Sequence, residues 1–200
     1  MVERLTGEER RRVIVEAAVA LFSQKGFRGT TTKEIAQAAG CSEATIFKHF
    51  ATKNELYSAI LETKSRIDET VAKAAQAAAR KDDAGVFRAV GLESLTRTEQ
   101  DPSLMRLLLF SALEGHELSH LFFESKRRGL HEFLSGYIKG RIADGVFQPV
   151  DPLLAAQGFV GMVAHYLLIH EIFGVKRPAG LLPEHVIDTF VALFLQGIRR

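Results

Sequence analysis

Apolar residues recur at helical spacing along nearly the whole chain. In the first segment the order i, i+3, i+4, i+7, i+8 is occupied by Ile14, Ala17, Ala18, Leu21 and Phe22, which gives an amphipathic α-helix one apolar face. Strand signals are scarce, and only five prolines occur in 200 residues. The pattern therefore predicts an all-α protein.

Residues that favour helix ends divide the N-terminal pattern into short helices. Three S/T-x-x-E sequences predict capping boxes, in which a hydroxyl and a carboxylate both accept from backbone N–H groups; they begin at Thr6, Thr31 and Thr52. Ser42 is a further candidate N-cap. Gly26 and Gly40 are suited to end helices, because glycine takes left-handed conformations with little strain.

The stretch from Thr31 to Phe50 reads as two short helices joined by a tight turn. So few residues between two capped helices force a sharp angle between them. This geometry lets the second helix enter a DNA major groove while the first crosses the backbone. We predict a helix-turn-helix, braced by the helix that starts after Thr6.

Further helices follow along the rest of the chain. The pattern predicts a long helix of about 28 residues from residue 53 and a buried, nearly all-apolar helix over residues 104–113. Other helices are predicted over residues 84–99, 117–143 and 183–198, and from Pro152 onward. Together they predict a three-helix DNA-binding head over residues 1–52 and a larger helical body over residues 53–200, to which dimerisation is assigned; effector binding is assigned to this body by the family resemblance given below.

No formally charged residue occurs from Pro152 to His170. About 19 such residues can cross a bilayer, so a membrane span is one alternative. Gln157, His165 and the absence of a basic flank instead favour a soluble helix covered on two sides, by its own body and by a second subunit. Paired with the last helix, it predicts a four-helix homodimer interface with no membrane partner, and the interface candidates are Phe159, Val163, Val186, Phe190, Leu193 and Phe194.

Charge is unevenly distributed along the chain. The composition, 46% hydrophobic and 25% charged with a net charge of +2, is ordinary for a globular protein. Residues 1–53 hold nine Lys or Arg and six Asp or Glu, whereas the remainder is slightly acidic. The positive excess thus coincides with the helix-turn-helix, as phosphate binding requires. A single cysteine and an N-terminus without an apolar segment fit a cytoplasmic protein.

Several side chains of the second short helix suit contact with DNA. Ser42 and Thr45 can donate to phosphate at the helix N-terminus. Glu43 can accept from a cytosine amino group, Ala44 can touch a thymine methyl, and Lys48 can contact phosphate or guanine. Arg28, in the loop before the helix-turn-helix, is a further candidate.

One pattern suggests different chemistry. The sequence His116-Glu117-Leu118-Ser119-His120 matches H-E-x-x-H, in which two histidines bind zinc and the glutamate acts as a base. The longer metzincin continuation fails, because Phe123 and Lys126 stand where glycine and the third histidine are required. We expect no metal site, no cofactor and no enzymatic activity. The alternatives are a regulatory metal site at His116 and His120, a redox switch at Cys41 ahead of a helix N-terminus and, most remotely, a zinc hydrolase.

The helix-turn-helix and its flanks resemble the TetR family of bacterial transcriptional regulators. The resemblance lies in GFRGTT from Gly26, T-x-x-x-I-A-x-x-A-G from Thr31, S-x-A-T-x-F-x-H-F from Ser42 and T-K-x-E-L from Thr52. It covers about residues 8–60. Three residues depart from the usual pattern: Cys41 replaces a valine, Ala44 a glycine, and Phe47 a tyrosine whose hydroxyl typically reaches a phosphate. Phe47 can pack against a base or sugar without that bond.

The resemblance implies a dimeric regulator with two ligands, operator DNA and a small-molecule effector. Positions that contact phosphate or support the recognition helix in the family match Thr31, Thr32, Lys33, His49 and Lys53. An effector cavity among the body helices is implied, for which the candidate lining residues are Phe87, Met105, Leu109, Phe110, Leu113, Phe122, Met162, His165 and Tyr166. The expected function is a nucleoid-associated repressor that leaves a palindromic operator when a largely apolar effector binds. A helical dimeric adaptor without sequence-specific DNA binding is the alternative.

Overall fold

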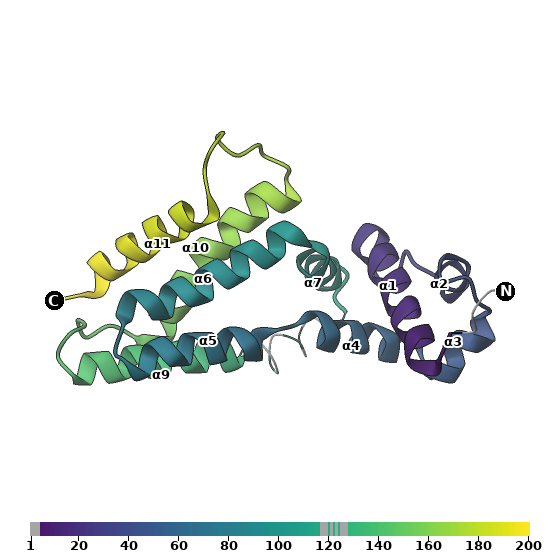
Figure 1. The fold of residues 1–200 in the computed structure, drawn as a ribbon, viewed down its shortest axis with the longest axis horizontal. Helices are drawn as coiled ribbons and strands as arrows, with labels where there is room; N and C mark the ends of the chain where they lie inside the picture. The colour runs from purple at the N-terminus through teal and green to yellow at the C-terminus, as the bar shows by residue number, and fades with distance from the viewer. Residues whose placement is uncertain (1–4, 117–119, 121, 123, 125–127) are drawn as a thin grey trace. The chain divides into compact units, whose positions relative to one another are not determined.

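A computed structural model of the protein describes residues 5–116, 120, 122, 124 and 128–200 (Figure 1). Within these ranges the chain forms helices and no strand, apart from an isolated β-bridge between Phe147 and Arg199. This confirms the all-α prediction. The helices are α1 (Gly7–Lys25), α2 (Thr32–Ala38), α3 (Glu43–His49), α4 (Lys53–Lys64), α5 (Ile67–Ala79), α6 (Asp83–Gln100), α7 (Ser103–Leu113), α9 (Arg128–Ala143), α10 (Pro152–Leu167), the π-helix η2 (Leu168–Ile172) and α11 (Pro183–Ile198).

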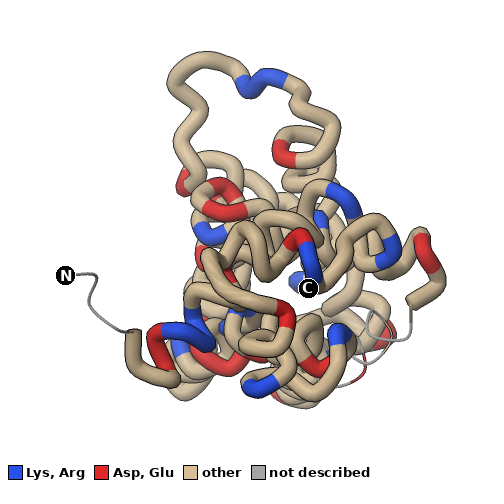
Figure 2. Tube along the Cα trace, turned by 90° about the vertical axis from the view of Figure 1, so that its right-hand side faces the viewer, with Lys and Arg blue, Asp and Glu red and all other residues tan. Residues whose placement is uncertain are grey.

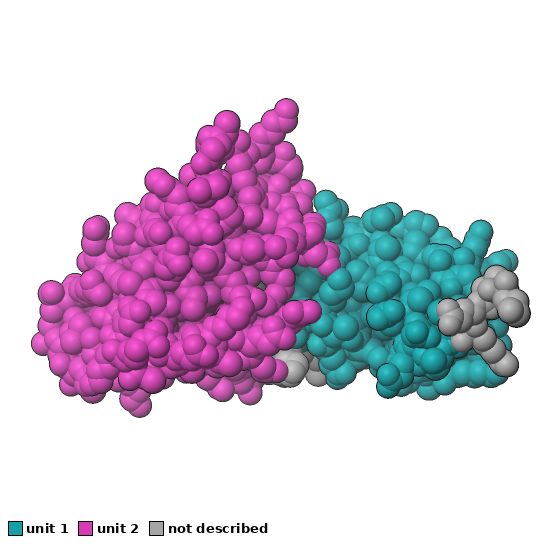
Figure 3. Space-filling view, viewed as in Figure 1, with its two compact units in different colours: residues 1–65, 103–122 teal, residues 66–102, 123–200 magenta. Residues whose placement is uncertain are grey.

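The chain divides into two compact units (Figure 3). Unit 1 comprises residues 1–65 and 103–122, and unit 2 comprises residues 66–102 and 123–200. The functional division predicted after residue 52 differs from these compact units and stays a prediction; helices α4 and α7 both pack within unit 1. Helix α7 reaches this unit because it contacts α1, far from it in the sequence.

The helix starts of unit 1 follow the predicted caps. Thr6 and Thr31 form complete capping boxes with Glu9 and Glu34. Ser42 accepts from the backbone of the first turn of α3, and Thr52 does the same for α4. The third box is incomplete, because the Glu55 carboxylate accepts from the backbone N–H of Ala51 at 2.7 Å instead of from that of Thr52.

The predicted long helix from residue 53 is wrong, because the chain forms two helices, α4 and α5. Ser65 is extended, with φ −78° and ψ 117°, and ends α4. Thr63 and Ser65 have weak helix propensities because their hydroxyls compete for backbone partners. The Thr63 hydroxyl donates to the Ala59 carbonyl at 2.7 Å. The break coincides with the boundary between the units.

Helix α7 is less buried than its apolar sequence predicts. Its buried residues are Ser103, Leu107 and Ser111, whereas Leu113 is 86% exposed. The Tyr57 hydroxyl of α4 donates to the Leu107 carbonyl at 2.8 Å, which fixes α7 to the core of unit 1. Burial raises the pKa of Tyr57 to about 12, so the hydroxyl remains a donor at neutral pH.

Unit 2 is built around α6, which packs against α5, α10 and α11. Phe87 of α6 is fully buried, and its ring lies 5.0 Å from that of Phe159 and 4.7 Å from that of Phe194. The N-terminal part of the predicted helix over residues 117–143 lies largely outside the described residues, and α9 forms its remainder. The α6 start holds Asp83, a buried carboxylate that accepts from the Tyr137 hydroxyl at 2.7 Å.

Helix α10 begins as predicted, with Asp151 as N-cap and Pro152 in the first turn. It continues into η2, and the combined segment Pro152–Ile172 is long and apolar enough to cross a bilayer by length and composition. Only 22% of its apolar window is buried in the protein. Its inner face is buried against unit 2, whereas Leu154 on the outer face is 66% exposed.

Candidate nucleic-acid interface and ligand cavity

Helix α3 presents a polar and accessible outer face. Its inner side is anchored by Ile46 and by Phe50 directly after the helix, both almost completely buried. On the opposite side Ala44 and Lys48 are exposed, and the Phe47 ring is 47% exposed. A large aromatic residue left in solvent on a short helix, next to a lysine, is suited to contact with another molecule.

The hydroxyls and the carboxylate at the start of α3 are oriented by bonds to one another. Ser42 and Thr45 hydroxyls are 2.9 Å apart. The Thr32 hydroxyl of α2 donates to the Glu43 carboxylate at 2.6 Å. Glu43 is therefore held towards α2 and has acceptor capacity left for a base. The bond between Thr32 and Glu43 joins α2 to α3, and we call these two helices the reading element, after the DNA contact that the sequence predicts for them.

None of the predicted DNA-contacting residues is fully buried. Those exposed to solvent are Arg28, Thr31, Lys33, Ser42, Glu43, Ala44, Phe47 and Lys48, and those partly buried are Thr32, Thr45, His49 and Lys53. The start of α2 is also held by an ion pair. The Glu34 carboxylate lies 2.7 Å from the Lys25 ammonium group. Hydrogen bonds from Lys25 and from Thr31 lower the pKa of Glu34 to about 2.

Lys53 has a different environment from the one expected of a phosphate contact. Its ammonium group donates to the carbonyl of Phe27 and lies 4.1 Å from the centre of the Phe27 ring. Burial lowers the pKa of Lys53, while the carboxylates of Glu114 and Glu34 oppose that effect. In this structure Lys53 supports the α1–α2 loop from within.

A second group holds the same loop, and sequence reasoning missed it. The Glu114 carboxylate accepts from the backbone N–H groups of Phe27 at 3.2 Å and of Arg28 at 3.3 Å. Gly26 permits this approach, since a Cβ added there would overlap the Glu114 carboxylate. We call the contact of Glu114 with the backbone of residues 26–28 the loop clasp. Its only sequence signal is Gly26, which the helix pattern explains equally well as a helix end.

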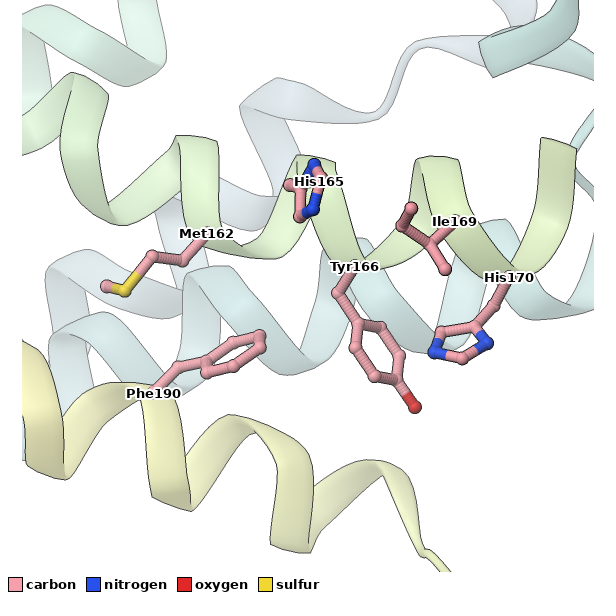
Figure 4. A pocket seen from close by; sticks show the side chains of 6 residues that line it. All are labelled: Met162, His165, Tyr166, Ile169, His170 and Phe190. Carbon is pink, nitrogen blue, oxygen red and sulfur yellow. The ribbon is translucent and has the colours of Figure 1, made fainter. Parts of the chain in front are cut away.

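A cavity of about 250 Å³ opens in unit 2 between α10, η2 and α11 (Figure 4). It is lined by Met162, His165, Tyr166, Ile169, His170 and Phe190. Three of these, Met162, His165 and Tyr166, were predicted for an effector cavity. Phe190 was predicted for the dimer interface instead. Ile169 and His170 were not predicted, because helical periodicity does not reveal a π-turn.

The other predicted cavity residues lie elsewhere. Phe87 is part of the aromatic core of unit 2, and Phe122 is buried. The remainder, Met105, Leu109, Phe110 and Leu113, belong to α7 in unit 1. They do not line the cavity of Figure 4.

Comparisons with known proteins identify the family. Residues 14–60 match the family of bacterial regulatory proteins of the tetR type, and residues 88–197 match the C-terminal domain of AefR-like transcriptional repressors. The transcriptional regulator RutR of Escherichia coli strain K12 is 30% identical over 197 residues, which cover 95% of this chain and 91% of RutR. The chain belongs to the TetR family.

Other proteins match the chain over most of its length. The uncharacterised regulator YvkB of Bacillus subtilis strain 168 is 27% identical, covering 92% of this chain and 95% of YvkB. The crystal structure of a TetR-family regulator from Mesorhizobium loti superimposes with a TM-score of 0.74 at 25% identity, over 98% of this chain and all of that one. AibR, solved with isovaleryl coenzyme A and operator DNA, has the same fold, with a TM-score of 0.67 at 24% identity over 92% of this chain and 97% of AibR. The protein is a ligand-responsive DNA-binding regulator, not an enzyme.

The zinc pattern has another explanation in a TetR-family regulator. The ring of His116 lies 4.1 Å from that of Phe27, so it packs over the α1–α2 loop. Glu117 lies outside the described residues, and His120 is exposed. Among the residues that the structure describes, no group of three metal-binding side chains occurs.

The residues predicted for dimerisation divide between core and surface. Phe159, Val163 and Val186 are buried within unit 2 itself. Leu193 is 58% exposed, and Phe190 and Phe194 are partly buried. Of the six candidates, Leu193 is therefore the one exposed to solvent.

Proposed function

We propose that the protein is a homodimeric repressor that binds a palindromic operator and leaves it when a small, largely apolar effector binds. The accessible face of α3 carries this proposal, because Phe47 and Lys48 stand free of the core next to the oriented Glu43 and Thr45. In a dimer two such helices would enter successive major grooves, with half-site centres about 34–36 Å apart or a multiple of one turn.

Lys48 supplies charge to this interface, and its partner there is a phosphate or a guanine. The test is selection of bound duplexes from a randomised pool, followed by anisotropy titration of the enriched sequence at several salt concentrations. Lys48→Ala should weaken binding and, for a phosphate contact, reduce the salt slope by about one. Lys139→Ala, an exposed lysine on α9, is the matched control and should change neither quantity.

The result that contradicts the proposal is equally clear. An unenriched pool, with the same weak affinity for every duplex, would favour the helical adaptor without sequence-specific binding. Repeating the selection on refolded, ligand-stripped protein removes a co-purified effector as the cause. Enrichment of a non-palindromic site would contradict the two-fold arrangement alone.

The dimer is supported by the outer faces of α10 and α11. On α10 the accessible positions Leu154, Gly158, Gly161 and His165 recur at helical spacing and carry no formal charge. Two glycines in this row allow another helix to approach closely. Leu193 extends the apolar surface on α11. Without a partner, the apolar side chains of Leu154 and Leu193 would remain in water, which a two-fold mate would prevent.

Introducing a charge at this surface tests the dimer. Leu154→Glu and Leu193→Glu should each shift sedimentation equilibrium towards the monomer and reduce affinity for the full palindrome more than for a half-site. Leu113→Glu places the same charge on a leucine that is 86% exposed in unit 1 and should leave the mass unchanged. A wild-type monomer at micromolar concentration would exclude the proposed assembly.

Effector release follows from linkage. An effector that binds preferentially to the conformation with low operator affinity must weaken DNA binding, and DNA must weaken effector binding by the same factor. The coupling free energy between two such sites is typically ~1–3 kcal/mol. AibR, with both isovaleryl coenzyme A and operator DNA bound, supports the idea that one chain of this fold holds both ligands. We place the protein in the bacterial cytoplasm, at the nucleoid. Equal operator affinity with and without a bound effector would contradict this regulation.

A further inference from the structure

The cavity between α10, η2 and α11 has an apolar and aromatic lining. Met162 and Phe190 form one wall, and Ile169 stands on the other side of Tyr166 (Figure 4). The Tyr166 ring lies 5.9 Å from that of Phe190 and 4.4 Å from that of His170. A flat molecule placed there would meet rings on several sides.

The Tyr166 hydroxyl at this site lacks a partner. Its oxygen is buried, and no hydrogen-bond partner occurs in the part of the chain that the structure describes. Burial raises the pKa of Tyr166, so the group stays protonated and can donate. Buried donors in folded proteins are almost always paired. A ligand with an acceptor would complete this one.

The nearby cation does not fill that role. Arg177 belongs to the loop between η2 and α11, whose basic stretch is blue in Figure 2. Its guanidinium lies 5.5 Å from the centre of the Tyr166 ring. It is bonded to both Glu99 and Glu171. Its charge is thus compensated by two carboxylates.

The backbone beside the cavity is also unusual. Helix α10 widens into the π-helix η2, which supplies Ile169 and His170 to the lining. The His170 Nδ1 atom lies 2.6 Å from the Val175 carbonyl oxygen, which fixes the ring against the loop and leaves Nε2 as a possible acceptor. Single π-turns inside α-helices occur frequently at functional sites.

Size and charge limit the ligand. An engineered cavity of about 150 Å³ holds benzene, so a cavity of about 250 Å³ is large enough for two fused rings or one substituted ring. The lining contains no Asp, Glu, Lys or Arg. A charged ligand would lose its hydration there without gaining a counter-ion.

The geometry points to a binding site for an uncharged, planar aromatic molecule with one hydrogen-bond acceptor, which Tyr166 recognises through its hydroxyl. The site specifies the effector class of the proposed regulator and rests on that function. Its ligand lies beside the outer face of α10, where His165 is exposed. A ligand bound in the cavity would thereby affect the surface of α10 that we propose to pair in the dimer.

Calorimetric titration of the full-length protein with two matched probes tests the site. The probes are 1-indanone, a planar bicycle with a carbonyl acceptor, and indane, which has nearly the same shape without the acceptor. We expect 1-indanone to bind roughly tenfold more tightly, the size of one hydrogen bond to a buried donor. Tyr166→Phe should abolish this preference and leave indane affinity unchanged.

Two further variants make the result specific. Met162→Trp fills the cavity and should abolish binding of both probes. Tyr137→Phe removes a hydroxyl of unit 2 that is already bonded to Asp83 and lies outside the cavity, so the preference for 1-indanone should persist. Equal affinity for the two probes, or a preference that survives in Tyr166→Phe, overturns the assignment.

The remaining outcomes separate this site from the function on which it rests. Protein that binds its operator but neither probe overturns the site alone. Protein that discriminates the probes but enriches no DNA overturns the regulator and retains the site. If a second copy of the chain fills the cavity, neither probe binds and Met162→Trp dissociates the dimer in sedimentation equilibrium, which also overturns the site.

Discussion

The carboxylate of Glu114 accepts a hydrogen bond of 3.2 Å from the backbone N–H of Phe27, a residue 87 positions earlier in the chain. The loop clasp therefore joins the end of α7 to the loop that leads into α2. Lys53 binds the carbonyl of Phe27 at the same place. The loop before the reading element is thus held both by its backbone N–H groups, which bind Glu114, and by a backbone carbonyl, which binds Lys53.

Loss of the clasp should weaken operator binding. Glu114→Ala removes the acceptor of two backbone N–H groups, so the loop gains freedom that DNA binding must remove. We expect operator affinity to fall by about five- to thirtyfold, corresponding to ~1–2 kcal/mol, while Glu114→Gln retains part of the affinity. Anisotropy titration measures this effect.

A control variant distinguishes loss of the loop clasp from the general effect of removing one negative charge. Glu132→Ala removes an exposed carboxylate from α9 and should leave operator affinity unchanged. If Glu114→Ala binds the operator as tightly as the wild type, the clasp does not position the reading element.

Two glycines of unit 1 should respond differently to alanine. Gly26 has φ 73° and ψ 178°, a region essentially restricted to glycine, and an added Cβ would overlap the Glu114 carboxylate. Gly40 has φ 59°, and an added Cβ would meet nothing within 4 Å. Gly40→Ala should cost about 1–2 kcal/mol of unfolding free energy, and Gly26→Ala clearly more. Chemical denaturation measures both, and equal losses would contradict the close approach of Glu114.

Two tyrosines of unit 2 provide a matched pair. The Tyr137 hydroxyl donates to the buried Asp83 carboxylate at 2.7 Å, so Tyr137→Phe should lower the unfolding free energy by ~1.5–3 kcal/mol, as for hydrogen bonds to charged groups. The Tyr166 hydroxyl is buried without a partner among the described residues, so Tyr166→Phe should leave the stability unchanged or raise it. Thermal unfolding of ligand-free protein compares the two, and a large loss in Tyr166→Phe would show that its hydroxyl is bonded in the free protein.

Acid should destabilise unit 2 through Asp83. Burial raises the pKa of Asp83, but hydrogen bonds from Arg141 and Tyr137 outweigh it and place this pKa below its usual value. The unfolded state, with a pKa of about 3.9, therefore binds the proton more readily than the folded state. The stabilisation is complete above about pH 5 and is lost as the pH falls through the folded pKa. Asp83→Asn should flatten this part of the stability profile, and an unchanged acid slope would contradict the assignment.

The sequence predicts those features of the head that depend on local hydrogen bonds. The caps at Thr6, Thr31 and Ser42 appear as expected because each bond spans three residues. The break at Ser65 was missed, since neither proline nor glycine marks it. The loop clasp was missed for a different reason: Glu114 and Phe27 meet only after the chain has folded.

The same limit applies to unit 2. Helical spacing identified α10 and α11 as apolar, but it could not decide which of their faces meets the protein's own core. Phe159 is consequently buried within the unit, whereas Leu154 remains accessible. The cavity was partly anticipated at Tyr166, yet the π-turn that adds His170 has no periodic signature.

The loop clasp binds peptide groups and not side chains at position 28. The exposed Arg28 side chain can therefore be exchanged without loss of either hydrogen bond that Glu114 accepts, provided that the new residue retains its backbone N–H. If Arg28 meets the operator, as the sequence predicts, a single substitution there would change the operator preference while the loop that presents the residue keeps its geometry.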